Sequence, residues 1–244
     1  MATATKMKSV MLSSKMLRQT MSEKGLTGTY AFVRTVTAID ELNRLRDALE
    51  VLHSTPSPNL TKEGRALRYK QQFDKAAAAA ERAAMAATEA LNDHEAALIR
   101  DAEIRAGLHK HVPEATQQEI RAALRSMSQE DRDRAVREAA QRGDANVIQA
   151  VRNAPSPLLT GAITAPMESL VGLLIQKTAP ELGQQRQDVE VAYMHLQGAT
   201  GAFGKEANAM RDPQLESAAG AQEAATKAAD AAIDAAAAGS LPAA

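Results

Sequence analysis

The sequence contains no cysteine and no tryptophan, and only three phenylalanines and three tyrosines among its 244 residues. Without cysteine the chain has no disulfide bond, no thiolate nucleophile and no metal–thiolate site, which is typical of a protein from a reducing compartment. Without many large aromatic rings, which usually dominate core burial, a core must be built from Leu, Ile, Val, Met and Ala. Apart from Ile and Val these residues are strong helix formers, so the composition predicts an all-α fold.

An excess of one charge sign is also absent, since 29 basic side chains face 30 acidic ones. A chain without net charge has no general field that attracts nucleic acid or an anionic membrane. Only the N-terminus is locally basic, because residues 1–25 contain Glu23 as their single acid. The candidate partner-docking residues, for a protein, DNA or membrane partner, are the basic residues of this arm: Lys6, Lys8, Lys15, Arg18 and Lys24.

Long apolar runs are missing as well. The N-terminus lacks the apolar run and cleavage site of a signal peptide. The best membrane-span candidate, residues 157–176, is interrupted by Pro166 and Glu168. We therefore expect a virion or cytoplasmic location, and three interpretations of the basic arm stay open: a mobile terminus, a docking helix or a mitochondrial transit peptide.

Residues 29–108 carry the strongest helical pattern and predict a long antiparallel helical hairpin. Its first helix ends near His53 and has an apolar stripe at helical spacing: Val36, Ile39, Leu42, Leu45, Leu49 and Leu52. A proline-containing loop, 54–59, follows, and Thr61 is placed to cap the next helix. From Lys62 to about Ala106 no proline occurs, which predicts one alanine-rich helix of roughly 45 residues, about 67 Å long. Alanine on its contact face would let helix backbones approach closely, as in a coiled coil.

The middle of the chain predicts shorter helices. Residues 109–157 are expected to form three of them, the second capped by Ser128 and the third by Asp144. Their dense charges, including Arg121 and Arg132, suggest solvated faces with near-neighbour ion pairs. Residues 158–211 are expected to form an apolar helical pair, with Thr164 as a cap. Glycines in the second helix of this pair indicate close packing or a kink: Gly198, Gly201 and Gly204.

Both ends of the chain are expected to be flexible. Residues 1–28 form the basic arm, and residues 212–244 form a low-complexity, alanine-rich tail with almost no Leu or Val to bury. Such a tail is expected to be frayed or disordered alone and to become ordered on assembly.

Motifs for chemistry are scarce, and we assign no catalytic, cofactor-binding or metal-binding residue. Glu50 and His53 have the Glu-x-x-His spacing of half a di-iron site, but no second pair accompanies them. His109 and His111 could hold a transition metal only with further ligands. A helix-turn-helix is conceivable between Ser128 and Asn153, but acids there nearly balance the arginines. The tripeptide at 142–144, Arg-Gly-Asp, is explained by a helix end followed by a helix start.

In general style the chain is similar to small helical structural or internal proteins of tailed bacteriophages. The similarity lies in its alanine-rich helices, its basic Met/Ser/Thr arm, its Ala/Asp tail and the segment GDANVIQAVRNAPSPLLTG at 143–161. This resemblance implies a virion component, whether an internal or ejection protein, a scaffold or a tail accessory protein. We therefore predict a non-enzymatic helical structural protein that assembles with itself or with other subunits and needs no cofactor. The alternatives are an adaptor or chaperone-like binding module and a metal-dependent enzyme acting through His109 and His111.

Overall fold

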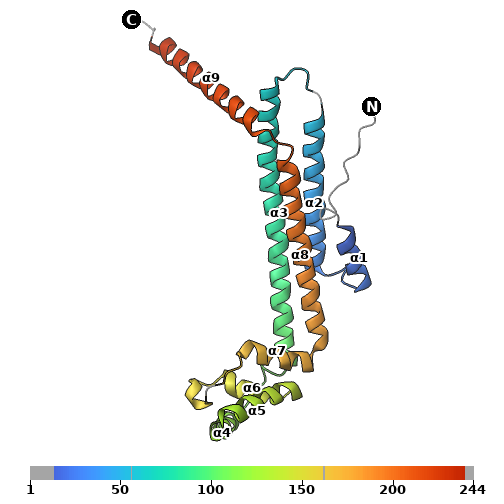
Figure 1. Cartoon of the computed structure of the whole chain (residues 1–244), viewed down its shortest axis with the longest axis vertical. Coiled ribbons are helices and arrows are strands. Elements are labelled where there is room, and N and C mark those ends of the chain that lie inside the picture. Colours follow the sequence, from blue (N-terminus) through green and yellow to red (C-terminus); the bar gives the residue numbers. More distant parts are fainter. Residues whose placement is uncertain (1–13, 56, 162, 240–244) are drawn as a thin grey trace. The chain divides into compact units, whose positions relative to one another are not determined.

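The computed structural model describes residues 14–55, 57–161 and 163–239, and over these residues it is all-α, as predicted (Figure 1). The chain divides into two compact units, one made of residues 1–90 and 192–244 and the other of residues 91–191. The helices α3 (Lys62–Arg105) and α8 (Pro180–Asn208) each contribute to both units. The boundary between the two units therefore lies inside these two helices, where no loop in the sequence marks it.

The long helix α3 forms as predicted, over 44 residues. The backbone N–H of Gly64 donates to Thr61 Oγ1 at 3.0 Å, which confirms Thr61 as the cap. In the first unit the buried positions of α3 are mostly alanine and, from Ala76 on, recur every three or four residues: Tyr69, Ala76, Ala80, Ala83, Ala87 and Ala90. A face built from methyl groups lets neighbouring helices approach closely, at the expense of buried area per residue.

Two helices pack beside α3 in the first unit, so this unit is a three-helix bundle and not only a hairpin (Figure 1). They are α2 (Tyr30–Ser54) and the second part of α8, and their buried residues are Phe32, Val36, Ile39, Leu42 and Leu49 on α2, with Ala192, Leu196, Ala199, Phe203 and Ala207 on α8. The hydroxyl of Tyr69 donates to the carbonyl of Ala207 at 3.0 Å, and that of Tyr193 to the carbonyl of Thr88 at 3.4 Å. The sequence placed α8 in a separate apolar pair because its mainly alanine stripe does not indicate which helix it will contact.

A buried arginine joins α2 to α8. The guanidinium of Arg46 contacts Glu206 at 2.9 Å and Asp47 at 3.2 Å, and it also pairs with Glu50. Burial alone would lower the pKa of Arg46, but hydrogen bonds to Glu206 and Asp47 and the charge of Glu50 raise it above its ordinary value. This network fixes the relative position of the two helices.

The described part of the N-terminal arm is ordered on the bundle. Helix α1 (Lys15–Glu23) packs against α2 through the buried side chains of Leu17 and Met21, and Arg18 forms an ion pair with Asp40. This differs from the flexible arm expected for residues 1–28, because the apolar residues of the arm find a buried position on α2. Residues 1–13 lie outside the described part of the chain.

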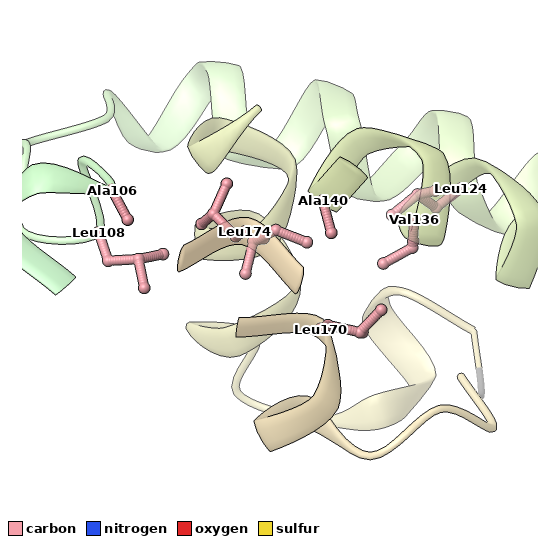
Figure 2. Packing of buried hydrophobic residues seen from close by; sticks show 8 residues of the cluster. Ala106, Leu108, Leu124, Val136, Ala140, Leu170 and Leu174 are labelled. Atoms are coloured by element: carbon pink, nitrogen blue, oxygen red, sulfur yellow. The ribbon is translucent and has the colours of Figure 1, made fainter. Parts of the chain in front are cut away.

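The second unit contains the short helices predicted for the middle of the chain. In chain order they are α4 (Glu114–Ser126), α5 (Gln129–Arg142), α6 (Ala145–Arg152), the 3₁₀ helix η2 (Pro157–Leu159) and α7 (Met167–Thr178). They enclose a small aliphatic core shown in Figure 2: Ala106, Leu108, Leu124, Val136, Ala140, Ile148, Leu170 and Leu174.

The predicted helix boundaries in this unit are confirmed. Ser128 Oγ accepts from the N–H of Asp131 at 3.2 Å, and Asp144 Oδ1 accepts from the N–H of Asn146 at 3.1 Å. Gly143 ends α5 with φ of 85°, a left-handed conformation that favours glycine. The Arg-Gly-Asp tripeptide is therefore a helix end and a helix start, as expected.

Several finer predictions for the middle of the chain are wrong. Arg121 and Arg132 are buried, because they satisfy backbone carbonyls: Arg121 Nε donates to Ala150 at 2.8 Å, and Arg132 Nε donates to Leu124 at 2.8 Å. Thr164 does not cap α7, since its hydroxyl and N–H both bond to Asp133. A Cβ added at Gly201 or Gly204 would meet no atom within 4 Å, so neither glycine marks a close packing contact.

Candidate functional site

The C-terminal helix α9 (Pro213–Gly239) starts in the first unit and then loses its contacts with the bundle. Asp212 Oδ1 caps it by accepting from the N–H of Leu215 at 3.1 Å, and Glu216 and Ala219 are buried. From residue 221 to residue 238, every side chain except that of Glu223 is exposed. Residues 213–239 of the tail are thus helical, which fits the high helix propensity of alanine.

One face of the exposed part of α9 carries only methyl groups. Ala224, Ala228, Ala231 and Ala235, here called the α9 stripe, have the spacing of residues that share one helix face. The residue before each member is charged, so a second stripe runs beside the first: Glu223, Lys227, Asp230 and Asp234. In proteins most helical stability comes from tertiary packing of one helix face, which the exposed part of α9 lacks. A partner that covered the α9 stripe would therefore stabilise the exposed part of α9.

A groove runs between α2 and α3 in the same unit. Two cavities border it, of about 260 and 500 Å³, and both are lined by Leu52 and Arg68. The smaller one is also lined by residues around the start of α9: Met210, Asp212 and Leu215. Leu49 and Ala76 are buried at its floor. We call this feature the α2–α3 groove, and its lining from α2 and α3 includes Leu45, Ala48, Leu49, Leu52, Lys62, Arg65, Arg68, Gln72, Lys75 and Ala76.

The α3 edge of the groove is cationic. Lys62, Arg65, Arg68 and Lys75 are all exposed and line its two cavities. Arg65, Arg68 and Lys75 form no ion pair with any residue that the structure describes. By contrast, Lys70 on the same helix is paired with Asp74 at 2.8 Å. The α2–α3 groove therefore combines an apolar floor with a positive edge.

Tyr69 closes one end of the groove and has a structural role. Its ring meets His53 edge to face, with 5.8 Å between ring centroids, and its hydroxyl is held by the carbonyl of Ala207. Burial raises the pKa of Tyr69 to about 12, so the hydroxyl keeps its proton at neutral pH. Next to it, the guanidinium carbon of Arg211 lies 4.7 Å from the centre of the Phe73 ring, which holds the start of α9 against α3.

The second unit has a larger cavity, of about 720 Å³, beside α7. The two arginines that line it are paired within the unit: Arg152 with Glu103 at 2.9 Å, and Arg186 with Glu95 at 3.1 Å. Because these cations are already paired, this cavity attracts an acidic partner less than the α2–α3 groove does.

Three of the five basic residues of the predicted docking arm lie in the described part of the chain. Lys6 and Lys8 lie outside the described residues. Lys15 and Arg18 are on α1, Lys24 directly follows it, and Arg18 is engaged by Asp40. The sequence missed the cationic edge of α3, although the spacing of Lys62, Arg65 and Arg68 was visible, because basic residues recur along a helix that also carries acids.

Three of the four candidate metal ligands are held by other contacts. Glu50 is bound by Arg46, His53 packs on Tyr69, and His109 Nε2 lies 3.1 Å from Glu103 Oε2. Within residues 14–55, 57–161 and 163–239, no three His, Asp or Glu side chains are placed to share a metal ion.

Within the same described ranges, no helix has the length and apolar character needed to cross a membrane. Comparison with protein-family models, with curated proteins and with solved structures gives no match for this chain.

Proposed function

We propose that this chain is a non-enzymatic helical assembly protein whose copies associate through the α9 stripe. The observation that carries the proposal is the exposure of α9 from residue 221 onward, on a helix whose alanines form a continuous face. The first unit is itself built on such a face, since α3 buries five alanines between Ala76 and Ala90. An uncovered face of the same kind is suited to the same type of helix contact.

The small size of alanine limits the strength of this contact. Burying four methyl groups contributes about 3 kcal/mol at roughly 0.8 kcal/mol each. A micromolar complex needs about 8 kcal/mol. We therefore expect association that depends on concentration and is reinforced by further contacts or by several copies.

The finer form of the proposal is a structural component of a tailed-phage virion, which rests on the general style of the sequence. Other structural subunits are then further partners, and residues 1–13 could contact DNA or a membrane through Lys6 and Lys8. This form predicts that the chain is found by mass spectrometry in purified particles of the phage that encodes it. Finding the chain only in the lysate, and never in particles, would remove the virion assignment and leave self-association as a separate question.

The experiment is a comparison of molar mass by light scattering over a concentration series, for the wild type and two variants of α9. Ala228→Gln with Ala231→Gln places two amides on the α9 stripe and should weaken association. Thr226→Gln with Ala237→Gln makes a similar change on the opposite side of the helix, which also carries the exposed Ile233, and should leave association as in the wild type. A wild type that stays monomeric at every concentration contradicts the proposal and favours the binding-module alternative.

A further inference from the structure

We propose that the exposed part of α9 from one copy docks into the α2–α3 groove of a second copy, antiparallel to α3. This inference rests on the proposed function, because it names the surface that receives the α9 stripe. The occupant is a second copy because α9 is one continuous helix from Pro213 to Gly239, held in its own bundle by Glu216 and Ala219. Residues beyond Gly220 cannot turn back into the groove of the same chain without breaking that helix.

The two surfaces match in polarity on both sides. The α9 stripe is bordered on one side by the charged residues Glu223, Asp230 and Asp234 and on the other side by further alanines. The α2–α3 groove has a cationic edge on α3 and an apolar edge on α2. Laying the stripe on the floor of the groove therefore places acids beside cations and alanines beside leucines at the same time.

The lengths of the two charged rows also match. Arg65 and Lys75 are ten residues apart on α3, a distance of about 15 Å at 1.5 Å per residue. Glu223 and Asp234 are eleven residues apart on α9, a distance of about 17 Å. Each row can thus contact the other along its whole length.

The spacing of the charges admits an antiparallel register. Arg68 and Lys75 are seven residues apart, as are Glu223 and Asp230. With α9 antiparallel to α3, Asp230 lies opposite Arg68 and Glu223 opposite Lys75. Asp234 then falls opposite Gly64, next to Arg65, a third pair that the parallel register with the same seven-residue spacing lacks.

The one cation in the acidic row supports the same register. Lys227 pairs with Glu223 in its own helix at 2.7 Å. In the antiparallel arrangement it falls opposite Gln71 and Gln72, the uncharged gap in the cationic row. The parallel register that aligns Glu223 with Arg65 would instead place it beside Arg68, which like-charge repulsion disfavours, whereas the parallel register that aligns Glu223 with Arg68 pairs only two of the three acids.

Such an interface is heterologous, because α9 and the groove are different surfaces of the same molecule. Each copy bound in this way still offers a free groove or a free α9, so the contact generates a ring if it closes and a chain of copies if it does not. Exposed ion pairs contribute little to affinity and mainly fix direction and partner choice. The apolar floor supplies the remaining attraction.

The test is a charge-reversal complementation measured by sedimentation velocity. Arg68→Glu with Lys75→Glu makes the groove negative, and Glu223→Lys with Asp230→Lys makes α9 positive. Each variant alone should associate about tenfold or more weakly than the wild type, because like charges now face each other. An equimolar mixture of the two should associate again, because each groove then finds an α9 of opposite charge. Arg137→Glu with Lys205→Glu, at two exposed sites that line neither cavity and lie outside α9, is the matched control for the charge change of the groove variant.

Cross-linking tests the register, since the chain contains no cysteine of its own. Gln72→Cys in one chain and Lys227→Cys in another should form a disulfide-linked dimer under mild oxidation, whereas Glu81→Cys with Lys227→Cys should not. A chain carrying both Gln72→Cys and Lys227→Cys that closes on itself as a monomer would overturn the second-copy occupant.

The outcomes separate this inference from the proposed function. If the wild type associates but the charge-reversed variants behave like their control, the groove is not the receiving surface, while assembly through α9 stands. If the wild type is monomeric at all concentrations, both are overturned. Restored association in the mixture together with the predicted cross-link supports both.

Discussion

Replacing Ala87 by Leu tests whether alanine on α3 sets the distance between helices. The Ala87 side chain is fully buried, with no exposed surface, in the middle of the buried face of α3. Adding three carbon atoms at such a position forces neighbouring side chains from their rotamers or moves the backbone, at a cost of about 1–3 kcal/mol. The lower helix propensity of leucine accounts for only a few tenths of that.

The assay is thermal unfolding followed by circular dichroism. A loss of about 2 kcal/mol should lower Tm by roughly 4–8 °C in a chain of this size. The matched control is Ala78→Leu, an exposed position of the same helix, which should change stability by less than about 0.5 kcal/mol. If Ala87→Leu is as stable as Ala78→Leu, then the alanine face of α3 is not a close contact and this explanation of the bundle fails.

Three further predictions concern single residues. Arg46→Ala should lower the free energy of unfolding, measured by urea denaturation, by about 2 kcal/mol or more, because Glu206 loses a charged hydrogen bond. An Arg46→Ala chain as stable as the wild type would show that the network is unimportant for stability. Tyr69→Phe should cost about 1 kcal/mol at neutral pH. Because burial raises the pKa of Tyr69 in the folded chain to about 12 from 10.0, its contribution is fully present below pH 10 and is lost as the pH rises toward 12, so alkaline titration should destabilise the wild type more than the Phe variant. Ser128→Ala should cost about 1 kcal/mol by removing the cap of α5, whereas Ser128→Asp should retain most of the stability.

Local chemistry made much of the fold predictable from the sequence. The absence of proline between Lys62 and Arg105 predicts a single long helix, and capping residues predict where helices begin. The ends of α5 and the start of α6 follow from Ser128, Gly143 and Asp144 in the same way. These signals act within a few residues and need no knowledge of the tertiary structure.

Long-range packing was not predictable in the same way. Nothing within α8 indicates that Ala207 accepts a hydrogen bond from Tyr69, 138 residues away. Nor does the sequence distinguish Arg121, whose guanidinium is buried against a carbonyl, from an arginine on a solvated face. The candidate docking surfaces depend on such packing, because α9 and the α2–α3 groove become apparent only when the three-helix bundle is formed.

The central claim, that copies of this chain associate through α9, is tested most directly by sedimentation velocity of the wild type over a concentration series. We predict a weight-average sedimentation coefficient that rises with concentration and falls again at high salt, since the contacts between α9 and the α2–α3 groove include exposed ion pairs. A single species of 25.9 kDa at every concentration and salt would contradict the claim.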